Sequence, residues 1–284
     1  IGYPVLIKAS AGGGGRGMRV VENSGELAGA IEAARREALS AFSDDTLFIE
    51  HWLAFSRHVE IQILGDHYGN LVHCFERECS IQRRHQKIIE EAPSPAVDED
   101  IRCRMGEAAL KAARKIGYSS AGTVEFLLSG SDFYFLEVNT RLQVEHPVTE
   151  MITGFDIVKE QLRIAAGEPL SKTQEEITFS GHAIECRINA EDPRSFIPCP
   201  GTVEHFHPPG GLGVRIDSQL YSGYKVPPHY DSLIAKVITW ADNRAQAISR
   251  MERALDEMVV AGISTNIPLQ QRLIRDETFK RGGT

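Results

Sequence analysis

A row of polar residues at every second position follows directly on the apolar residues 133–136 of this chain. The row consists of Glu137, Asn139, Arg141, Gln143 and Glu145. If the segment is extended throughout, side chains two positions apart point to the same face, and all five groups share one wall. Carboxylate, amide and guanidinium groups in this order, directly after a buried strand, indicate a site for an anion and a metal ion. The alternative is an amphipathic edge strand whose polar face lies in water.

The bulk composition limits the classes of protein that need to be considered. The chain has 284 residues, 42% of them hydrophobic and 25% charged, which is enough for one large or two modest domains with a packed core. The formal net charge of −8 argues against a nucleic-acid-binding protein, which would present a basic face. No apolar run approaches the roughly 18 residues that span a bilayer, and the first residues lack the pattern of a signal peptide. We therefore expect no nucleic-acid partner and no membrane partner.

The cysteines are odd in number and form no CxxC pair. They are Cys74, Cys79, Cys103, Cys186 and Cys199. This pattern predicts reduced thiols in a cytoplasmic protein, and neither a disulfide framework nor a zinc site.

Hydrophobic periodicity and turn residues predict a mixture of strands and helices. Strands are expected at residues 5–10, 17–21, 46–50, 58–64, 71–76, 86–90, 123–128 and 133–138. Helices are expected at residues 25–42, 99–116, 155–166, 242–261 and 268–275, the first of them capped by Ser24. From Gly181 onward short strands and Pro/Gly-rich turns dominate, so a domain boundary is placed near residues 172–177. Because the strands do not alternate strictly with helices, the pattern favours an α+β fold.

Four consecutive glycines at residues 12–15 lie between two predicted strands. Together with Gly17 they formally contain GxGxxG, but the dinucleotide-binding motif needs a helix directly after the glycines, and here a strand follows. No Gly-Lys-Ser/Thr occurs, which excludes a Walker loop. A glycine-rich hairpin can still close over phosphates, because bare backbone N–H groups reach the oxygens without side-chain clashes, and Lys8 on the incoming strand could meet a phosphate. A flexible surface hairpin is the alternative.

Glu125 and Glu137 lie on the two arms of the hairpin predicted at residues 123–138. An acid within an apolar run such as the one around Glu125 is costly to bury unless it is paired or binds a metal. Mg²⁺ in nucleotide enzymes is usually held by one or two carboxylates together with phosphate oxygens. A two-residue turn at residues 130–131 would pair Glu125 with Leu136 and place the two acids on opposite faces. A metal site at both acids therefore requires a β-bulge or an odd-length loop.

Two further polar stretches are candidates for the same site. Residues 82–87 are uniformly polar, and in an extended conformation His85 and Lys87 share a face that suits phosphate or carboxylate oxygens. A solvated basic face is the alternative. Residues 182–189 have the pattern of a strand that ends in polar groups, and Arg187 on it contributes only if it points back at the arginine and the final glutamate of the polar row.

Four motifs, in this order, closely resemble biotin carboxylase, an ATP-grasp enzyme. They are residues 8–18, 83–87, 137–149 and 185–191, and the resemblance runs over essentially the whole chain. It implies an α+β ATP-grasp fold with a partial glycine-rich lid at residues 1–52, a core with the metal and bicarbonate site at residues 53–176, and a biotin carboxylase C-terminal domain at residues 177–284. The family also has an N-terminal domain that would precede Ile1, so little or no turnover is expected of the chain alone.

The resemblance implies ATP-dependent carboxylation of biotin on a carrier protein, with bicarbonate as the source of CO₂ and carboxyphosphate as the intermediate. The tail at residues 279–284 is similar to the biotin carboxylase subunit of bacterial acetyl-CoA carboxylases, which places the reaction in fatty acid synthesis. Three alternatives remain: the same part of another acyl-CoA or pyruvate carboxylase, another ATP-grasp ligase such as a carbamoyl phosphate synthetase half, and an inactive fragment that only binds or dimerises.

The implied cofactors are ATP and Mg²⁺ or Mn²⁺ at two sites, with biotin as a substrate. The implied partners are bicarbonate, a biotinylated carrier protein, carboxyltransferase subunits and a second copy of the chain. The second copy would bind through the C-terminal domain near Arg215, where Leu212 replaces an expected aromatic residue.

The resemblance also implies a role for individual residues. Bicarbonate would be cradled by Lys87, Arg141, Gln143 and the backbone of Val144, with Glu145 as the general base and Arg187 stabilising the enolate-like form of biotin. The metal ions would be held by Glu125, Glu137 and Asn139. ATP would contact Lys8, Gly12, Gly13, Gly14, Gly15, Met18, Glu50, the backbone of His51 and Leu53, His58, Gln82, His85 and Leu127. The family usually has lysine in place of His51, and because that contact is made by the backbone, binding should survive the change.

Overall fold

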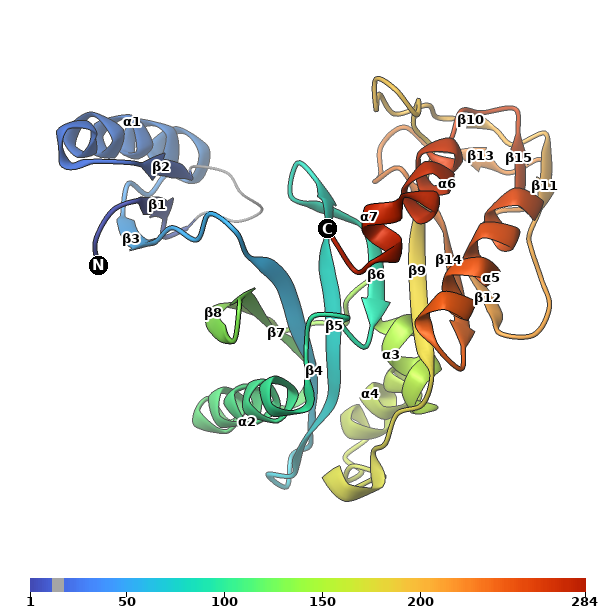
Figure 1. The fold of residues 1–284 in the computed structure, drawn as a ribbon, viewed down its shortest axis with the longest axis horizontal. Coiled ribbons are helices and arrows are strands. Elements are labelled where there is room, and N and C mark those ends of the chain that lie inside the picture. Colours follow the sequence, from blue (N-terminus) through green and yellow to red (C-terminus); the bar gives the residue numbers. More distant parts are fainter. Residues whose placement is uncertain (12–17) are drawn as a thin grey trace. The chain divides into compact units, whose positions relative to one another are not determined.

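The computed structural model describes residues 1–11 and 18–284, so the glycines Gly12 to Gly15 lie outside the described residues (Figure 1). The chain divides into two units, Ile1–Ser56 and Arg57–Thr284. The lid expected at residues 1–52 stays a prediction. The further boundary expected near residues 172–177 lies inside the second unit and stays a prediction.

The first unit is a small antiparallel sheet covered by one long helix. Its strands β1 (Val5–Ala9), β2 (Arg19–Val21) and β3 (Leu47–His51) are ordered β2-β1-β3, and α1 spans Ser24–Phe42. Val5, Ile7, Val21 and Ala34 form its core. The helix is capped by Asn23, whose side chain accepts a hydrogen bond from the backbone N–H of Gly25 at 3.0 Å, so the predicted cap lies one residue too far along the chain.

The second unit is built on one eight-stranded antiparallel sheet with the order β12-β14-β9-β6-β5-β4-β7-β8. The strands of this sheet are β4 (Arg57–Gly65), β5 (Leu71–Arg83), β6 (Gln86–Ala92), β7 (Ser120–Ser129), β8 (Asp132–Asn139), β9 (His182–Asn189), β12 (Val214–Ser218) and β14 (Leu233–Ala241). Two small ribbons pair β10 (Gly201–Thr202) with β13 (Lys225–Val226) and β11 (His205–His207) with β15 (Val259–Ala261).

Six α-helices and a short 3₁₀ turn among the described residues of this unit pack around the sheet. They are α2 (Glu99–Lys115), α3 (His146–Thr153), α4 (Ile157–Ala165), the 3₁₀ turn (Gln174–Glu176), α5 (Arg244–Glu257), α6 (Ile267–Arg275) and α7 (Glu277–Lys280). In Figure 1 α3 lies beside β9 and α5 lies beside β14, and α4 contacts β7. None of the helices in the described part of the chain is both long and apolar enough to span a bilayer.

One face of the long sheet changes from apolar to charged along its strands. On β9 the alternate residues Ala183, Glu185 and Arg187 point to this face, and Ala183 packs under α3. Ile184 and Ile188, which point the other way, join the core formed with α5 and α6. The helices α3 and α4 therefore cover the apolar end of the face, and the charged end is left for the site described below.

The structure corrects four expectations about local conformation. The polar row is not extended throughout, because β8 ends at Asn139 and the chain then turns into α3, which has Pro147 in its first turn. The helix expected to run to residue 261 ends at Glu257, and the following β-branched segment forms β15. The strand expected to end at residue 76 continues to Arg83. Arg84 and His85, with φ angles of 50° and 64°, form the tight turn between β5 and β6, so His85 does not share an extended face with Lys87.

Candidate functional site

The β7–β8 hairpin contains the bulge that a two-acid metal site requires. From the turn up to Phe126, which pairs with Phe135, the register is that of a two-residue turn. The register then shifts by one residue at Leu136, and Glu125 pairs directly with Glu137. The predicted departure from the simple hairpin is confirmed, and it places both carboxylates on the same face.

The three residues predicted to bind metal lie together beyond this bulge. The amide nitrogen Nδ2 of Asn139 lies 3.0 Å from Oε1 of Glu125 and 3.3 Å from Oε1 of Glu137. One small group thus reaches an oxygen of each acid, so the two carboxylates converge. Two carboxylates and an amide oxygen are hard donors of the kind that Mg²⁺ and Mn²⁺ prefer. The residues therefore fit the expected metal ion.

Lys87 is the centre of the buried charge cluster beside these acids. Its ammonium nitrogen lies 2.5 Å from Oε2 of Glu60, 3.1 Å from Oε1 of Glu125 and 2.6 Å from Oε1 of Glu145. Burial alone would raise the pKa of Glu60, but Lys87 and Arg77 lower it to about 2. Burial opposes the charge on Lys87 as well, and its acidic neighbours nevertheless raise its pKa. The ammonium group therefore stays charged between the three acids.

Glu125 is held as an anion by two neighbours. Burial would raise its pKa, but a hydrogen bond with His58 and the charge of Lys87 lower it to about 2. The Nε2 atom of His58 lies 2.9 Å from Oε2 of Glu125, and Nδ1 of the same ring lies 2.7 Å from the amide of Gln82. The two nucleotide-binding candidates on β4 and β5 are thus brought next to the metal candidates.

Arg77 is a functional neighbour that sequence reasoning missed. It lies under the cluster with no exposed surface, and it donates hydrogen bonds to Glu60 (2.6 Å), Gln62 (2.7 Å), Thr149 (2.9 Å) and Thr123 (3.1 Å). It holds the oxygen of Glu60 that Lys87 does not bind. The predicted strand stopped one residue before Arg77, and an isolated arginine between two glutamates gave no signal of burial.

The expected role of Arg187 requires it to point back at Arg141 and Glu145, and the structure shows its contact with Glu145. One of its terminal nitrogens lies 2.9 Å from Oε2 of Glu145, and its Nε donates to Oε1 of Glu90 at 2.6 Å. Glu145 therefore lies between two cations, with one oxygen on Lys87 and the other on Arg187. Arg141 is exposed and donates to Oε1 of Gln143 at 3.0 Å.

Lys236 is the second residue that sequence reasoning missed. Its ammonium group donates to the backbone oxygen of Val144 at 2.9 Å and lies 3.2 Å from Oδ2 of Asp217. The lysine thus fixes the backbone of Val144, which is an expected contact for bicarbonate. Its position on β14, far along the chain, gave no hint of this contact.

The remaining nucleotide-binding candidates are distributed over both units. In Ile1–Ser56, Lys8 on β1 forms an ion pair of 2.5 Å with Glu50 on β3. His51 is the last residue of β3, and Met18 and Leu53 flank the same small sheet. In Arg57–Thr284, Leu127 lies on β7 and His85 at the exposed β5–β6 turn.

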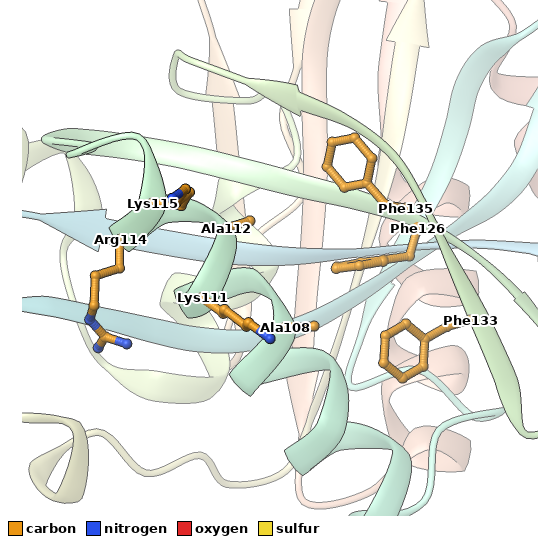
Figure 2. Close-up of a pocket in the computed structure, with 8 residues that line it drawn as sticks. All are labelled: Ala108, Lys111, Ala112, Arg114, Lys115, Phe126, Phe133 and Phe135. Atoms are coloured by element: carbon orange, nitrogen blue, oxygen red, sulfur yellow. The ribbon is translucent and has the colours of Figure 1, made fainter.

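A cavity of about 930 Å³ lies between α2 and the β7–β8 hairpin (Figure 2). Its lining is Ala108, Lys111, Ala112, Arg114, Lys115, Phe126, Phe133 and Phe135. Phe126 follows Glu125 by one position on β7, so the phenylalanines face away from the two acids. Because no acid or histidine lines the cavity, it is not the site that the sequence predicts.

Comparison with known proteins agrees with this arrangement. Residues 1–173 match the family model "Carbamoyl-phosphate synthase L chain, ATP binding domain", and residues 185–284 match "Biotin carboxylase C-terminal domain". The biotin carboxylase of Haemophilus influenzae is 58% identical over 284 residues, which are 100% of this chain and 63% of that protein. One subunit of the pyruvate carboxylase of Methanothermobacter thermautotrophicus is 57% identical over 283 residues, covering 99% of this chain and 58% of that protein.

Solved structures give the same result. A biotin carboxylase complex with βγ-ATP from Campylobacter jejuni matches with a TM-score of 0.94 and 49% identity, covering 98% of this chain and 63% of that one. The biotin carboxylase domain dimer of Hydrogenobacter thermophilus 2-oxoglutarate carboxylase, in complex with MgADP, ADP and bicarbonate, matches with a TM-score of 0.93 and 52% identity, covering 99% and 63%. The chain thus spans less than two thirds of the length of these relatives. On its two family regions and its fold, the chain belongs to the biotin carboxylase family, with an ATP-grasp region followed by the biotin carboxylase C-terminal domain.

Proposed function

We propose that this chain carries the ATP-grasp and C-terminal parts of a ligase that carboxylates biotin with bicarbonate and ATP. The proposal rests on the position of Glu145 between two cations. This buried carboxylate has one oxygen on Lys87 and the other on Arg187. A base between two cations suits the removal of a proton from an oxyanion that the same cations bind, because the cations stabilise the charge that develops.

In the proposed reaction, bicarbonate binds to Lys87, Arg141, Gln143 and the backbone of Val144. Glu145 takes the proton of bicarbonate, and the freed oxygen attacks the γ-phosphorus of ATP, breaking its bond to ADP. The resulting carboxyphosphate decomposes to CO₂ and phosphate. Phosphate takes the proton from the ureido nitrogen of biotin, and this nitrogen attacks CO₂ to give carboxybiotin. Arg187 stabilises the enolate-like biotin with its planar guanidinium.

The metal and nucleotide contacts complete the proposal. Glu125, Glu137 and Asn139 would hold Mg²⁺ or Mn²⁺ at two sites, and the metal ions would neutralise the phosphates. Lys8 would exchange Glu50 for a phosphate, and His58 and Gln82 would lie near the ribose and phosphates.

We place the parent protein in acetyl-CoA carboxylase and fatty acid synthesis because of the tail at residues 279–284. Its partners would be a biotinylated carrier protein, carboxyltransferase subunits and a second copy of the chain, in the cytoplasm. Relatives at similar identity include part of a pyruvate carboxylase and a 2-oxoglutarate carboxylase domain, so carboxylation assays with each acyl acceptor distinguish these parents. Next to the proposed dimer contact, Arg215 bonds Glu150 and Asp217 of its own chain, and Leu212 is 88% exposed.

The decisive experiment measures phosphate release from ATP with and without bicarbonate and free biotin. It is run on this chain alone and on this chain joined to the residues that its longer relatives carry outside the aligned part. We expect biotin to stimulate cleavage in the longer protein and little turnover in the shorter one. Glu145→Gln should lower turnover by at least about 10²-fold, the scale of general acid–base catalysis, while nucleotide affinity stays unchanged.

The matched control is Glu150→Gln, one turn into α3, which removes a bond to Arg215 and leaves the cluster intact. Cleavage that requires bicarbonate but ignores biotin would favour a carbamoyl phosphate synthetase-like ligase. Nucleotide binding without cleavage in the longer protein would identify an inactive binding piece.

A further inference from the structure

Two glutamates lie directly opposite each other in the core of the long sheet. Glu90 on β6 and Glu185 on β9 are register partners of the antiparallel pair, and neither has any exposed surface. Oε1 of Glu90 accepts a hydrogen bond from Arg187 at 2.6 Å. Within the part of the chain that the structure describes, Oε2 of Glu90 and both oxygens of Glu185 have no hydrogen-bond donor. Buried carboxylate oxygens without donors are costly, and this pair presents three of them.

The cations around the pair are already committed to other groups. Glu185 is faced by Glu90 from β6, by Glu145 from the loop before α3, by Lys236 from β14 and by Arg187 from its own strand. Arg187 bonds Glu90 and Glu145, and Lys236 bonds the backbone of Val144 and Asp217. Lys236 and Arg187 therefore act on Glu185 only through their charge, and no described residue forms a salt bridge with it.

We propose that Glu185 is a protonated carboxyl group that donates a hydrogen bond to Glu90 and thereby positions Arg187. One shared proton satisfies both glutamates, since two carboxylates at adjacent buried positions do not both ionise. Glu90 then remains the single anion on the Nε side of Arg187. The Nη2 atom of Arg187, which lies 2.5 Å from Oε1 of Glu90, also lies 2.9 Å from Oε2 of Glu145. On the proposed function, the rest of the guanidinium is left for biotin. Glu185 is a positioning residue, because it acts through Glu90 and Arg187.

Both pKa values are shifted in the direction that a proton retained on the pair requires. Burial raises the pKa of Glu185 well above its usual range, and burial raises the pKa of Glu90 to about 7 against the opposing charge of Arg187. When the proton is lost at higher pH, a second anion lies beside Arg187. We expect the guanidinium to be drawn toward the two glutamates and away from Glu145.

Glu91 supplies a matched control one residue along β6. It is also buried but points to the opposite face, where it bonds His182 at 2.7 Å and Arg244 at 2.7 Å and 3.0 Å. Its oxygens are satisfied by ion pairs, and it is not connected to Arg187. A change at Glu91 therefore tests the loss of a buried glutamate without changing the contacts among Glu185, Glu90 and Arg187.

The first test measures the proton without using activity. Infrared spectra of the chain in H₂O and D₂O should show the C=O band of a protonated carboxyl group near neutral pH. Glu185→Gln should remove that band, and Glu91→Gln should leave it. A wild-type spectrum without the band, or a band that survives in Glu185→Gln, would overturn the proposal.

The second test follows the midpoint of thermal unfolding with pH. A group whose folded pKa is raised contributes stability that is complete below its unfolded pKa and is lost as pH rises through the folded pKa. For Glu90 this window runs from about 4.3 to about 7, and for Glu185 it extends higher. Glu185→Gln is neutral at every pH and still donates to Glu90, so it should gain stability relative to the wild type between pH 5 and pH 8. Glu91→Gln should be destabilised without that gain, and a Glu185→Gln curve parallel to the wild type contradicts the proposal.

The third test uses the biotin-dependent reaction of the longer protein. Glu185→Gln should keep kcat within about threefold at neutral pH and hold it to higher pH than the wild type. Glu185→Leu, which cannot donate, should lower kcat/KM for biotin at least tenfold with nucleotide affinity unchanged. Equal pH profiles for Glu185→Gln and wild type overturn the positioning role. If the wild type shows no biotin dependence, the proposed function fails, and the spectra still decide whether Glu185 holds the proton.

Discussion

Two lysines, one in each unit, bind glutamates in opposite ways. Among the residues that the structure describes, Lys8 in Ile1–Ser56 forms a salt bridge with Glu50 alone, and 36% of the Glu50 side chain is exposed. Lys87 in Arg57–Thr284 binds three glutamates that are almost entirely buried. A partly exposed single pair costs little to break, whereas a cation surrounded by buried anions cannot leave without exposing them to an apolar interior. We therefore expect Lys8 to exchange Glu50 for another partner readily and Lys87 to keep its three glutamates.

The largest expected effect on stability is that of Lys87→Met. It leaves Glu60, Glu125 and Glu145 without their shared cation, and we expect the free energy of unfolding to fall by about 3–5 kcal/mol. The two tryptophans lie one in each unit, Trp52 and Trp240, so each unit can be followed by fluorescence in urea after the other tryptophan is replaced by phenylalanine. The loss should be confined to the Trp240 signal. An equal loss at Trp52 would show that the units unfold together.

Acid provides the second test. Glu60 and Glu125 both have a pKa lowered to about 2, so their contribution to stability is complete above their unfolded pKa and is lost as pH falls through the folded value. We expect the Trp240 transition to weaken between about pH 4.3 and pH 2. Glu60→Gln should be less stable than the wild type at pH 7 and should lose less on acidification. If Glu60→Gln leaves the acid response unchanged, groups other than Glu60 cause the loss of stability in acid.

A smaller effect is expected on nucleotide binding when Lys8 is changed. If Lys8 exchanges Glu50 for a phosphate, Lys8→Met should weaken ATP binding about tenfold, or roughly 1.4 kcal/mol. Arg35→Met, which removes an exposed ion pair with Asp45 in the same unit, should not mimic that loss. Calorimetric titration with MgATP measures both variants. Identical affinities for Lys8→Met and wild type would remove Lys8 from the nucleotide site.

The smallest effect is that of the same Lys8→Met substitution on folding. A partly exposed ion pair contributes about 0–1 kcal/mol, so the Trp52 transition should move little. A loss as large as that expected for Lys87→Met would contradict the contrast between the two lysines.

The sequence predicted those parts of the site that depend on neighbours along the chain. Alternation correctly placed Glu137 and Asn139 on one face. Counting residues across the hairpin showed that a metal site needs a bulge or an odd-length loop, and the structure has a bulge, at Leu136. Alternation failed after Asn139, because β8 ends there and the chain leaves the sheet before α3 begins at His146. Glu145 reaches Lys87 all the same, through the loop between β8 and α3.

The contacts that the sequence could not predict are those between strands far apart in the chain. Arg77 and Lys236 have their partners on other elements, and no local pattern marks either residue. The pairing of Glu90 with Glu185 depends on β6 and β9 being neighbours, which is a property of the sheet order. Local periodicity carries no information about that order.

The pairing of β6 with β9 also limits how the protein can be divided. The first family region ends at residue 173 and the second begins at residue 185, yet residues 89–92 form a ladder with residues 183–186. A protein fragment that stopped at residue 173 would leave β6 as an open sheet edge, with Ile89 and Ala92 exposed beside uncompensated glutamates. Such an edge is a template for aggregation. The two regions can be recognised separately by comparison, but we expect a fragment that contains only the first region to aggregate.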